Sequence, residues 1–363
     1  MKEEHAPPVR TVRWRGVILR LIALALALLG WSLLTAGCAR EPGPVSLAPA
    51  KPPATRAGRI ALYRKTVQAF LKAGRLPIID MEVMLSDRTP AARLIGEMDR
   101  AGVAIAAVTS RSAERIRSAV RRHPARLVPL TAAPGGMAWA APGGGFLKSA
   151  RAQIEAGSIG IGRVRLDLGP GKYLKGEKKE AREKDINTQK AAFEALLRLS
   201  AETKTPIWLE MEPEDDGVGW LERQLRAHPR ASVMWNRAGL LPTSAKLPGY
   251  GHGLLRALTL RRPNLFLILT QRPPRRQRIF PSPRANLLFD PGGGFSPEWR
   301  TMIEARIAHF HTGSSMEPSR PNEYLSRVWT YRAWILDALT AAARRRLAYR
   351  NAWRFIARAK WEE

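Results

Sequence analysis

Histidine and cysteine are scarce in this sequence, which has six histidines and one cysteine among 363 residues. Zinc-type sites are built from imidazole, thiolate or carboxylate groups, commonly three or four that converge on the ion. The histidines beyond residue 100 are also widely spread, at positions His123, His228, His252, His309 and His311. The sequence therefore predicts no metal centre built from histidine and cysteine.

Acidic residues are scarce as well, because 31 aspartates and glutamates face 60 lysines and arginines, a formal net charge of +29. Such an excess favours polyanionic surroundings such as nucleic acid, anionic lipid or lipopolysaccharide. The bases are scattered along the chain and form no recognised nucleic-acid motif, so we expect no nucleic-acid partner. A hydrophobic content of 45% excludes disorder throughout.

The only cysteine, Cys38, follows a basic segment and the 14-residue apolar run LIALALALLGWSLL, residues 21–34. This order is typical of a secretory signal. An uncleaved membrane anchor is the alternative, although 14 apolar residues are few for a span. Residues 34–38 (LTAGC) resemble the lipobox of bacterial lipoproteins, which implies that Cys38 is lipidated and becomes the mature N-terminus.

Three regions follow from this interpretation: a signal peptide (1–37), the lipidated cysteine with a Pro/Ala-rich tether (38–58), and a folded domain (59–363). Removing residues 1–37 leaves 55 bases and 29 acids, a net charge of +26. A lipid anchor and a basic surface together hold a protein to a membrane. We expect a protein of the bacterial cell envelope that faces the periplasm. Ala39, where such lipoproteins can carry aspartate, favours the outer membrane.

Apolar strand candidates alternate with helical stretches from residue 59 onward, which predicts a parallel sheet. About eight such units suit a distorted TIM-like (β/α)8 barrel with C-terminal helices. A doubly wound open sheet is the alternative. The candidate strands are LPIIDMEVML (76–85), VAIAAVTS (103–110), RLVPLT (126–131), GIGRVRLDL (160–168), PIWLEME (206–212), ASVMWN (231–236), NLFLILT (264–270) and ANLLFD (285–290).

Two further segments stand out. The glycine-rich stretch at 134–145 lacks the lysine and serine or threonine of a phosphate loop and is predicted to be a flexible loop. The mixed-charge run at 172–185 is predicted to be a solvated surface.

Several segments in order resemble the amidohydrolase superfamily, the metal-dependent TIM-barrel hydrolases and decarboxylases. IIDMEVML and the following helix and strand are similar to the start of that family's barrel. IEAGSIGIGRVRLDL, KTPIWLEMEP and HPRASVMWNRAG resemble its fourth, fifth and sixth strands, and PEWRTMIEARIAHFHTG its last strand. The resemblance implies a (β/α)8 barrel that hydrolyses amide or ester bonds with the help of bound metal.

The family's catalytic positions are occupied by other residues in this chain. Glu82 and Met84 stand where the first strand has two histidines, and Glu210 stands at the fifth-strand histidine. Gly313 or Thr312 stands at the position of the catalytic aspartate near the last strand. The complete set of candidate residues of this degenerate site is Glu82, Met84, Arg163, Arg165, Trp208, Glu210, Glu212, Trp235, Asn236, Arg237, His311 and Gly313.

We interpret these replacements as a barrel that has lost its metal and its catalysis. Buried charges must be paired, because an isolated one costs several kcal/mol. We therefore expect Arg165 and Arg237 to form ion pairs with Glu82 and Glu210 in place of a metal ion. A mouth rich in Arg163, Arg165, Arg237, Trp208 and Trp235 is predicted to bind an anionic or aromatic small molecule or an envelope polymer.

Two alternatives remain open at this point. Carboxylates at Glu82 and Glu210, joined by Glu212 and Asp290, suit a divalent cation with oxygen ligands, and such a site would belong to an active hydrolase of amide or ester bonds. The other alternative is a basic protein that binds the envelope surface through its charge alone.

Overall fold

The structure is a computed structural model of the whole chain. It describes residues 45, 47, 50–86, 89–169, 175–213, 215–236, 250–270, 288–289, 294–315, 320 and 322–362. Cys38, the signal peptide and part of the tether lie outside these residues. In the part of the chain that is described, no helix combines the length and apolar character needed to cross a bilayer.

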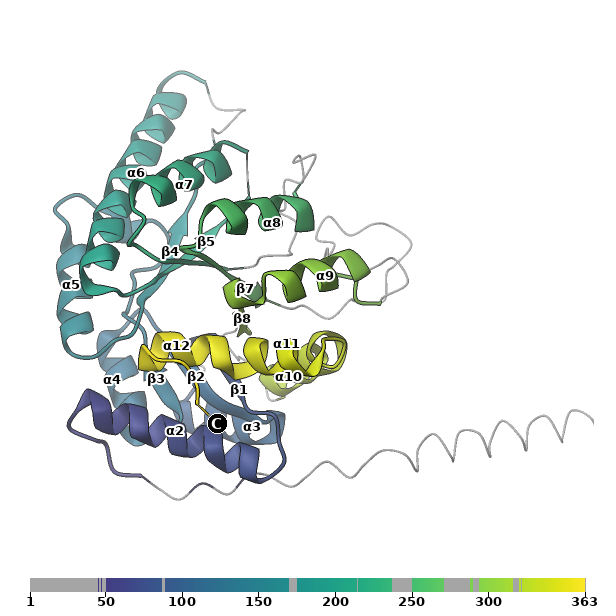
Figure 1. Cartoon of the computed structure of the whole chain (residues 1–363). Coiled ribbons are helices and arrows are strands. Elements are labelled where there is room, and N and C mark those ends of the chain that lie inside the picture. Colours follow the sequence, from purple (N-terminus) through teal and green to yellow (C-terminus); the bar gives the residue numbers. More distant parts are fainter. Residues whose placement is uncertain are drawn as a thin grey trace, which may run out of the picture. The chain divides into compact units, whose positions relative to one another are not determined.

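Among the described residues, eight parallel strands form two sheets, in the orders β1-β2-β3 and β4-β5-β6-β7-β8. Strands that are neighbours in a sheet are also consecutive in the sequence, and helices cover the outside of the sheets (Figure 1). The strands are β1 (Ile78–Met84), β2 (Val103–Thr109), β3 (Leu127–Pro129), β4 (Ile161–Leu166), β5 (Ile207–Met211), β6 (Val233–Trp235), β7 (Leu265–Thr270) and β8 (Phe310–Gly313).

The described α-helices are α2 (Arg56–Lys72), α3 (Ala91–Ala101), α4 (Ala113–Arg122), α5 (Gly145–Glu155), α6 (Glu177–Thr203), α7 (Asp215–Ala227), α8 (His252–Arg261), α9 (Pro297–Ala305), α10 (Glu323–Tyr331), α11 (Ala341–Arg345) and α12 (Asn351–Ala357). Short 3-10 turns are η1 (Ala138–Ala140) and η2 (Ile307–His309), and π-helical turns are η3 (Arg332–Leu336) and η4 (Arg346–Arg350).

The two sheets close into a barrel at two joints. Between β3 and β4, the backbone N–H of Ile159 donates to Pro129 O at 2.9 Å, and that of Thr131 donates to Gly160 O at 2.8 Å. Between β8 and β1, the hydrogen bonds among described residues run through side chains, such as Thr312 Oγ1 to Ile79 O. The fold is thus a distorted (β/α)8 barrel with C-terminal helices, as predicted from the sequence.

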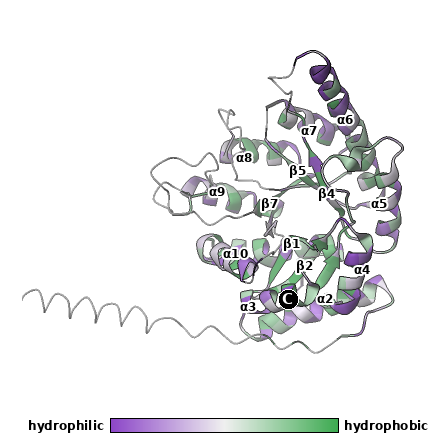
Figure 2. Cartoon of the chain, turned by 180° about the vertical axis from the view of Figure 1, so that it is seen from behind, coloured by the Kyte–Doolittle hydropathy of each residue, from purple (hydrophilic) through white to green (hydrophobic). Residues whose placement is uncertain are grey.

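The strands are apolar and buried, whereas the exposed ends of the helices are hydrophilic (Figure 2). Val103, Ile105 and Val108 of β2 are fully buried because both faces of a parallel sheet are covered. The part of the mixed-charge run that the structure describes is mostly exposed, and residues 177–185 of it form the first turns of α6.

The start of one helix and the position of one strand differ from those predicted. Helix α2 begins at Arg56, inside the predicted tether, because Thr55 Oγ1 accepts a hydrogen bond from Gly58 N and caps the helix. The segment ANLLFD forms no barrel strand in its described residues. There Phe289 makes an isolated antiparallel bridge to Phe295, and β8, which lies in the segment that resembles the family's last strand, supplies the eighth strand.

Trp208 fills the interior of the barrel. Its side chain extends from β5, is fully buried, and donates a hydrogen bond from Nε1 to Met81 O of β1 at 2.8 Å. Strands β1 and β5 belong to different sheets, so this bond crosses the barrel. Gly160, just before β4, leaves the room for the indole ring, because a Cβ there would overlap it.

Gly160→Ala is therefore expected to lower the free energy of unfolding by about 1–3 kcal/mol, the usual cost of overpacking a core. Urea unfolding followed by circular dichroism measures this change. Gly96→Ala is the matched control, since Gly96 lies within α3 and a Cβ there meets no neighbour. That control should raise stability by about 0.5–1 kcal/mol through helix propensity. Equal effects at the two positions would contradict the packing argument.

Candidate functional site

A cluster of charged and polar side chains lies at the carboxyl ends of the strands, where barrel enzymes place their active sites. Arg163 of β4 donates from Nε to Glu210 Oε2 of β5 at 2.5 Å, and the same nitrogen lies 3.7 Å from Glu82 Oε1 of β1. Asn236, directly after β6, donates from Nδ2 to Glu82 Oε1 at 2.5 Å. We call these four residues the mouth cluster.

The mouth cluster joins strands that are not neighbours, so its side chains point into the barrel. Glu82 is nearly fully buried, with 1% of its side chain exposed, whereas Arg163 and Glu210 remain 18% and 14% exposed. At such burial a carboxylate needs a paired charge, and the guanidinium of Arg163 supplies it for both glutamates. This geometry orders a charged network, but it leaves no nucleophile in contact with a general base among these four side chains.

The predicted ion pairs are formed by a different arginine. Arg165, which was expected to pair with the glutamates, has an exposed side chain and makes no ion pair within the described residues, whereas Arg163 contacts both carboxylates. Arg165 contributes only its carbonyl oxygen, which accepts a hydrogen bond from Trp139 Nε1. The other expected partner, Arg237, lies outside the described residues.

The residues present do not fit a divalent cation. The guanidinium of Arg163 already occupies the place beside Glu82 and Glu210 that such an ion would take, and like charges repel. Glu212 is exposed, and Asp290 lies outside the described residues. Met84 and Gly313 offer no hard oxygen ligand from their side chains. In the ranges that the structure describes, no three histidine, cysteine, aspartate or glutamate side chains converge on a point.

The two tryptophans predicted at the mouth are core residues instead. Trp208 is fully buried, and Trp235 is 1% exposed. Trp235 donates from Nε1 to Met211 O at 2.9 Å and packs edge-on against Tyr250. Neither indole therefore lies on an accessible surface, so these two tryptophans do not form the open mouth that the sequence predicted. The glycine-rich stretch likewise contains a buried side chain, Trp139, and a short helical turn.

Gly313 and His311 both lie on β8. A Cβ at Gly313 would overlap the side chain of Ile268 and approach Glu82, so glycine at this position makes room beside the mouth cluster. His311 is completely buried between the rings of Phe266 and Phe355 rather than at an open mouth. Burial, with smaller effects from His309 and Arg354, lowers the pKa of His311 to about 3.

This lowered pKa predicts a loss of stability in acid. Below pH about 6.5 the unfolded chain protonates this histidine while the folded chain does not, so stability falls as the pH drops toward about 3. The contribution approaches about 1.4 kcal/mol per pH unit. His311→Phe keeps an aromatic ring there and should flatten this part of the curve, measured by urea unfolding between pH 7 and pH 4. An unchanged slope in the variant would contradict the assignment.

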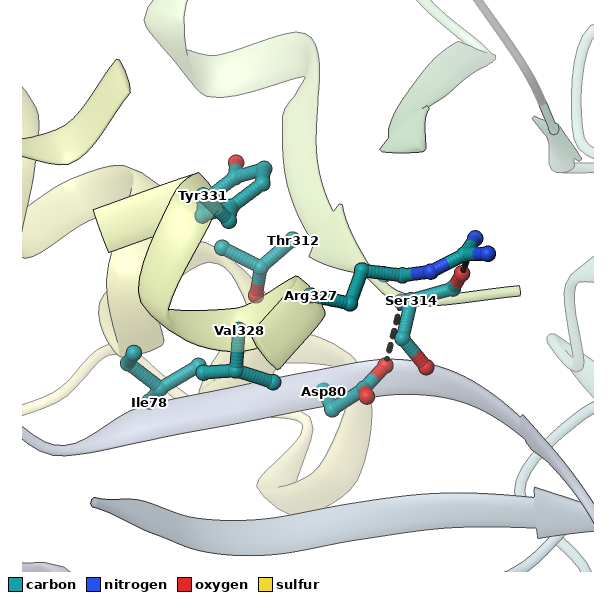
Figure 3. Close-up of a pocket in the computed structure, with 8 residues that line it drawn as sticks. Ile78, Asp80, Thr312, Ser314, Arg327, Val328 and Tyr331 are labelled. Atoms are coloured by element: carbon teal, nitrogen blue, oxygen red, sulfur yellow. Dashed lines mark hydrogen bonds between the residues drawn. The ribbon is translucent and has the colours of Figure 1, made fainter. Parts of the chain in front are cut away.

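Sequence reasoning missed Asp80, two residues before Glu82. Its Oδ1 accepts a hydrogen bond from the backbone N–H of Glu82 at 3.0 Å and, as Figure 3 shows, one from that of Ser314 at 2.9 Å. Its Oδ2 accepts one from the hydroxyl of Tyr324 on α10 at 2.8 Å. Burial raises the pKa of Asp80, and these hydrogen bonds oppose that effect. A lone aspartate in an apolar strand was the available signal, but two of its three partners, Ser314 and Tyr324, lie more than 230 residues away.

The fold and the mouth cluster define an α/β barrel protein with a charged network where barrel enzymes have their active site. No protein-family model matches the chain, and no curated protein matches it. Among solved structures, it is similar to the phosphotriesterase homology protein of Escherichia coli, complexed with phosphate in its active site. The sequence identity is 13%, the TM-score is 0.48, and the similarity covers 77% of this chain and 99% of the other.

Proposed function

We propose that this protein is a bacterial envelope lipoprotein whose amidohydrolase-like barrel has lost its metal and its catalysis and serves in binding. The observation that carries the proposal is the position of Arg163, whose side chain links Glu82 and Glu210 across the barrel. A guanidinium that pairs with two carboxylates replaces the charge of a metal ion without offering the open coordination position that a catalytic metal needs. The order of the family-like motifs along the sequence supports the amidohydrolase origin.

The binding partner that we propose is an anionic component of the envelope, such as lipopolysaccharide or an anionic phospholipid surface. The chain beyond residue 37 carries a net charge of +26, which attracts polyanions over its surface. Arg163 is already neutralised by two glutamates, so the surface bases rather than the mouth cluster attract the partner. The anchor at Cys38 would hold the barrel in the periplasm, at the outer membrane.

Metal analysis of the purified full chain tests the loss of catalysis. We expect zinc and manganese contents far below one ion per chain, unchanged in Glu82→Gln and Glu210→Gln. One bound ion per chain that disappears in these variants, together with an amide- or ester-hydrolysing activity, would overturn the proposal in favour of an active hydrolase.

Labelling and binding experiments test the envelope assignment. Cells given a radioactive fatty acid should label the protein, and Cys38→Ser should abolish the label. The unlipidated Cys38→Ser chain should bind vesicles of phosphatidylglycerol but not of phosphatidylcholine, with affinity that falls steeply as salt rises. Arg163→Met should leave this binding unchanged. Salt-independent binding to both kinds of vesicle would contradict a role for the surface charge.

A further inference from the structure

Four basic side chains gather where α2 begins and where α6 and α12 end. Arg56 and Arg59 are the first and fourth residues of α2, Lys204 directly follows α6, and Arg358 directly follows α12. Arg56, Lys204 and Arg358 are exposed, and Arg59 is partly exposed. We call these four residues the basic patch. Within the described part of the chain, none of the four forms an ion pair.

Hydrogen bonds hold the ends of these three helices together. Arg56 Nη2 donates to Ile356 O at 3.3 Å, near the end of α12, and Arg358 Nη2 donates to Thr203 O at 3.0 Å, at the end of α6. Both bonds go to carbonyl oxygens, which leave the guanidinium charges uncompensated. Burial, followed by the positive charges of Arg358 and Arg59, lowers the pKa of Arg56. The bases therefore repel one another, and an anion beside them would relieve this repulsion.

Acidic side chains do not neutralise the basic patch from its own helices. Helices α2 and α12 contain no aspartate or glutamate. Glu202, near the end of α6, accepts two hydrogen bonds from Arg151, at 2.5 and 2.7 Å, so its charge is already paired. Exposed arginines elsewhere do meet acids, as Arg117 meets Glu114 on α4. The basic patch is thus a concentration of unpaired positive charge rather than part of an ion-pair network.

The basic patch lies at the opposite end of the barrel from the mouth cluster. The turn after α6 leads into β5. The turn after α5, where the guanidinium of Arg59 packs against Gly157, leads into β4. Both turns lie at the amino ends of their strands, and the strands are parallel, so the patch belongs to the amino-terminal side of the barrel. The mouth cluster lies at the carboxyl ends.

The basic patch also lies where the domain meets its proposed tether. Cys38 precedes Arg56 by 18 residues, which span at most about 60 Å when fully extended. A lipid on Cys38 would keep the start of α2 within that distance of the bilayer. Bases close to an anionic leaflet are attracted to it, and a lipid anchor combined with a basic surface holds more firmly than the anchor alone.

We propose that the basic patch docks on the anionic lipid surface of the membrane that carries the anchor. Guanidinium groups suit this role because they bind phosphate oxygens through paired hydrogen bonds. In the docked state the mouth cluster points away from that membrane. This inference rests on the proposed envelope lipoprotein and goes beyond it, because it names the face that meets the lipid and the orientation of the barrel.

The orientation of the lipidated full chain in phosphatidylglycerol-containing vesicles tests the docking. With Cys38 lipidated, an introduced cysteine is the only free thiol for a fluorescent label. Ala57→Cys places the label beside the basic patch. Ala138→Cys places it at the mouth side, because the neighbouring Trp139 bonds to the carboxyl end of β4. Both alanines are exposed. A spin-labelled headgroup lipid should quench the label at position 57 and leave that at position 138 bright. Equal quenching, or stronger quenching at position 138, would overturn the proposal.

Matched changes of charge separate the basic patch from net charge alone. Arg56→Gln with Arg358→Gln removes two charges from the patch. Arg111→Gln with Arg165→Gln removes two exposed charges from the carboxyl side of β2 and β4. Sedimentation of the unlipidated Cys38→Ser chain with phosphatidylglycerol vesicles measures the affinity, with phosphatidylcholine vesicles as background. We expect a loss of about fivefold per patch base, roughly 25-fold for the pair, and a much smaller loss in the control.

The outcomes distinguish this inference from the proposed function. Equal losses in the two double variants would mean that net charge alone binds the lipid, which overturns the docking face and leaves the envelope role standing. Failure of the unlipidated chain itself to bind phosphatidylglycerol vesicles would overturn both. The labelled chains retain all four bases, so the quenching result does not depend on how the glutamine variants fold.

Discussion

Trp208→Ala should lower the free energy of unfolding by about 3–5 kcal/mol, at the upper end of single substitutions in a core. Three losses add together. The indole is fully buried inside the barrel, its removal leaves a cavity that a closed ring of strands cannot collapse to fill, and Met81 O loses the donor that reaches it from β5. Denaturant unfolding monitored by circular dichroism measures the change.

Two further variants separate these contributions. Trp208→Phe keeps most of the apolar volume but removes the Nε1–H donor, so it should cost less than the alanine variant. Trp329→Ala is the exposed control, because this tryptophan on α10 is 43% exposed, and its effect should stay within about 0.5 kcal/mol. A loss at position 208 no greater than at position 329 would rule out a role for the indole as an internal support.

Arg163→Met should lower stability by about 3–5 kcal/mol at neutral pH, since breaking a buried pair by removing one partner leaves the other charge uncompensated. Here two glutamates share the guanidinium, and Glu82 is almost entirely inside the barrel. Methionine keeps much of the volume of the arginine stem, so the loss of stability arises mainly from the missing positive charge. Urea unfolding at pH 7 and constant salt measures it.

A double-variant comparison tests whether the loss arises from this pair. Arg163→Met combined with Glu210→Gln removes one of the two carboxylates that need the guanidinium, and the pair should be coupled by about 0.5–3 kcal/mol, as contacting residues are. The double variant should therefore be more stable than the sum of the single effects predicts. Strict additivity would contradict the ion pair. Arg117→Met, at an exposed pair on α4, is the control and should change little.

Much of the fold was predictable because parallel strands are buried on both faces and read as short apolar runs. Seven of the eight candidate segments contain a barrel strand, from β1 to β7. The eighth candidate, ANLLFD, was chosen for its apolar character, but its described residue Phe289 makes only an antiparallel bridge. The strand β8 is only four residues long and lies in the segment that resembles the family's last strand. Hydrophobicity predicts that a segment is buried and does not predict its partner.

The candidate site was predicted in part. Glu82 and Glu210 do face each other across the barrel and do share an arginine, as pairing of buried charges requires. The sequence could not distinguish Arg163 from Arg165, because residues two apart on a strand point the same way and differ only in depth. Arg163, one step deeper, reaches both glutamates, while Arg165 is exposed at the level of Glu210. The hydrogen bond from Tyr324 to Asp80 depends on how α10 packs, which no local pattern encodes.

The joint between β1 and β8 has a further consequence for how the barrel is closed. Adjacent strands elsewhere in each sheet are held by ladders of backbone hydrogen bonds, whereas this joint depends on a few side-chain contacts, chiefly those of Asp80, Thr312 and Ser314. Single substitutions can therefore remove the hydrogen bonds of this joint, whereas no side-chain change removes the backbone ladders within each sheet. The closure of the barrel between its first and last strands thus depends on the identity of a few residues.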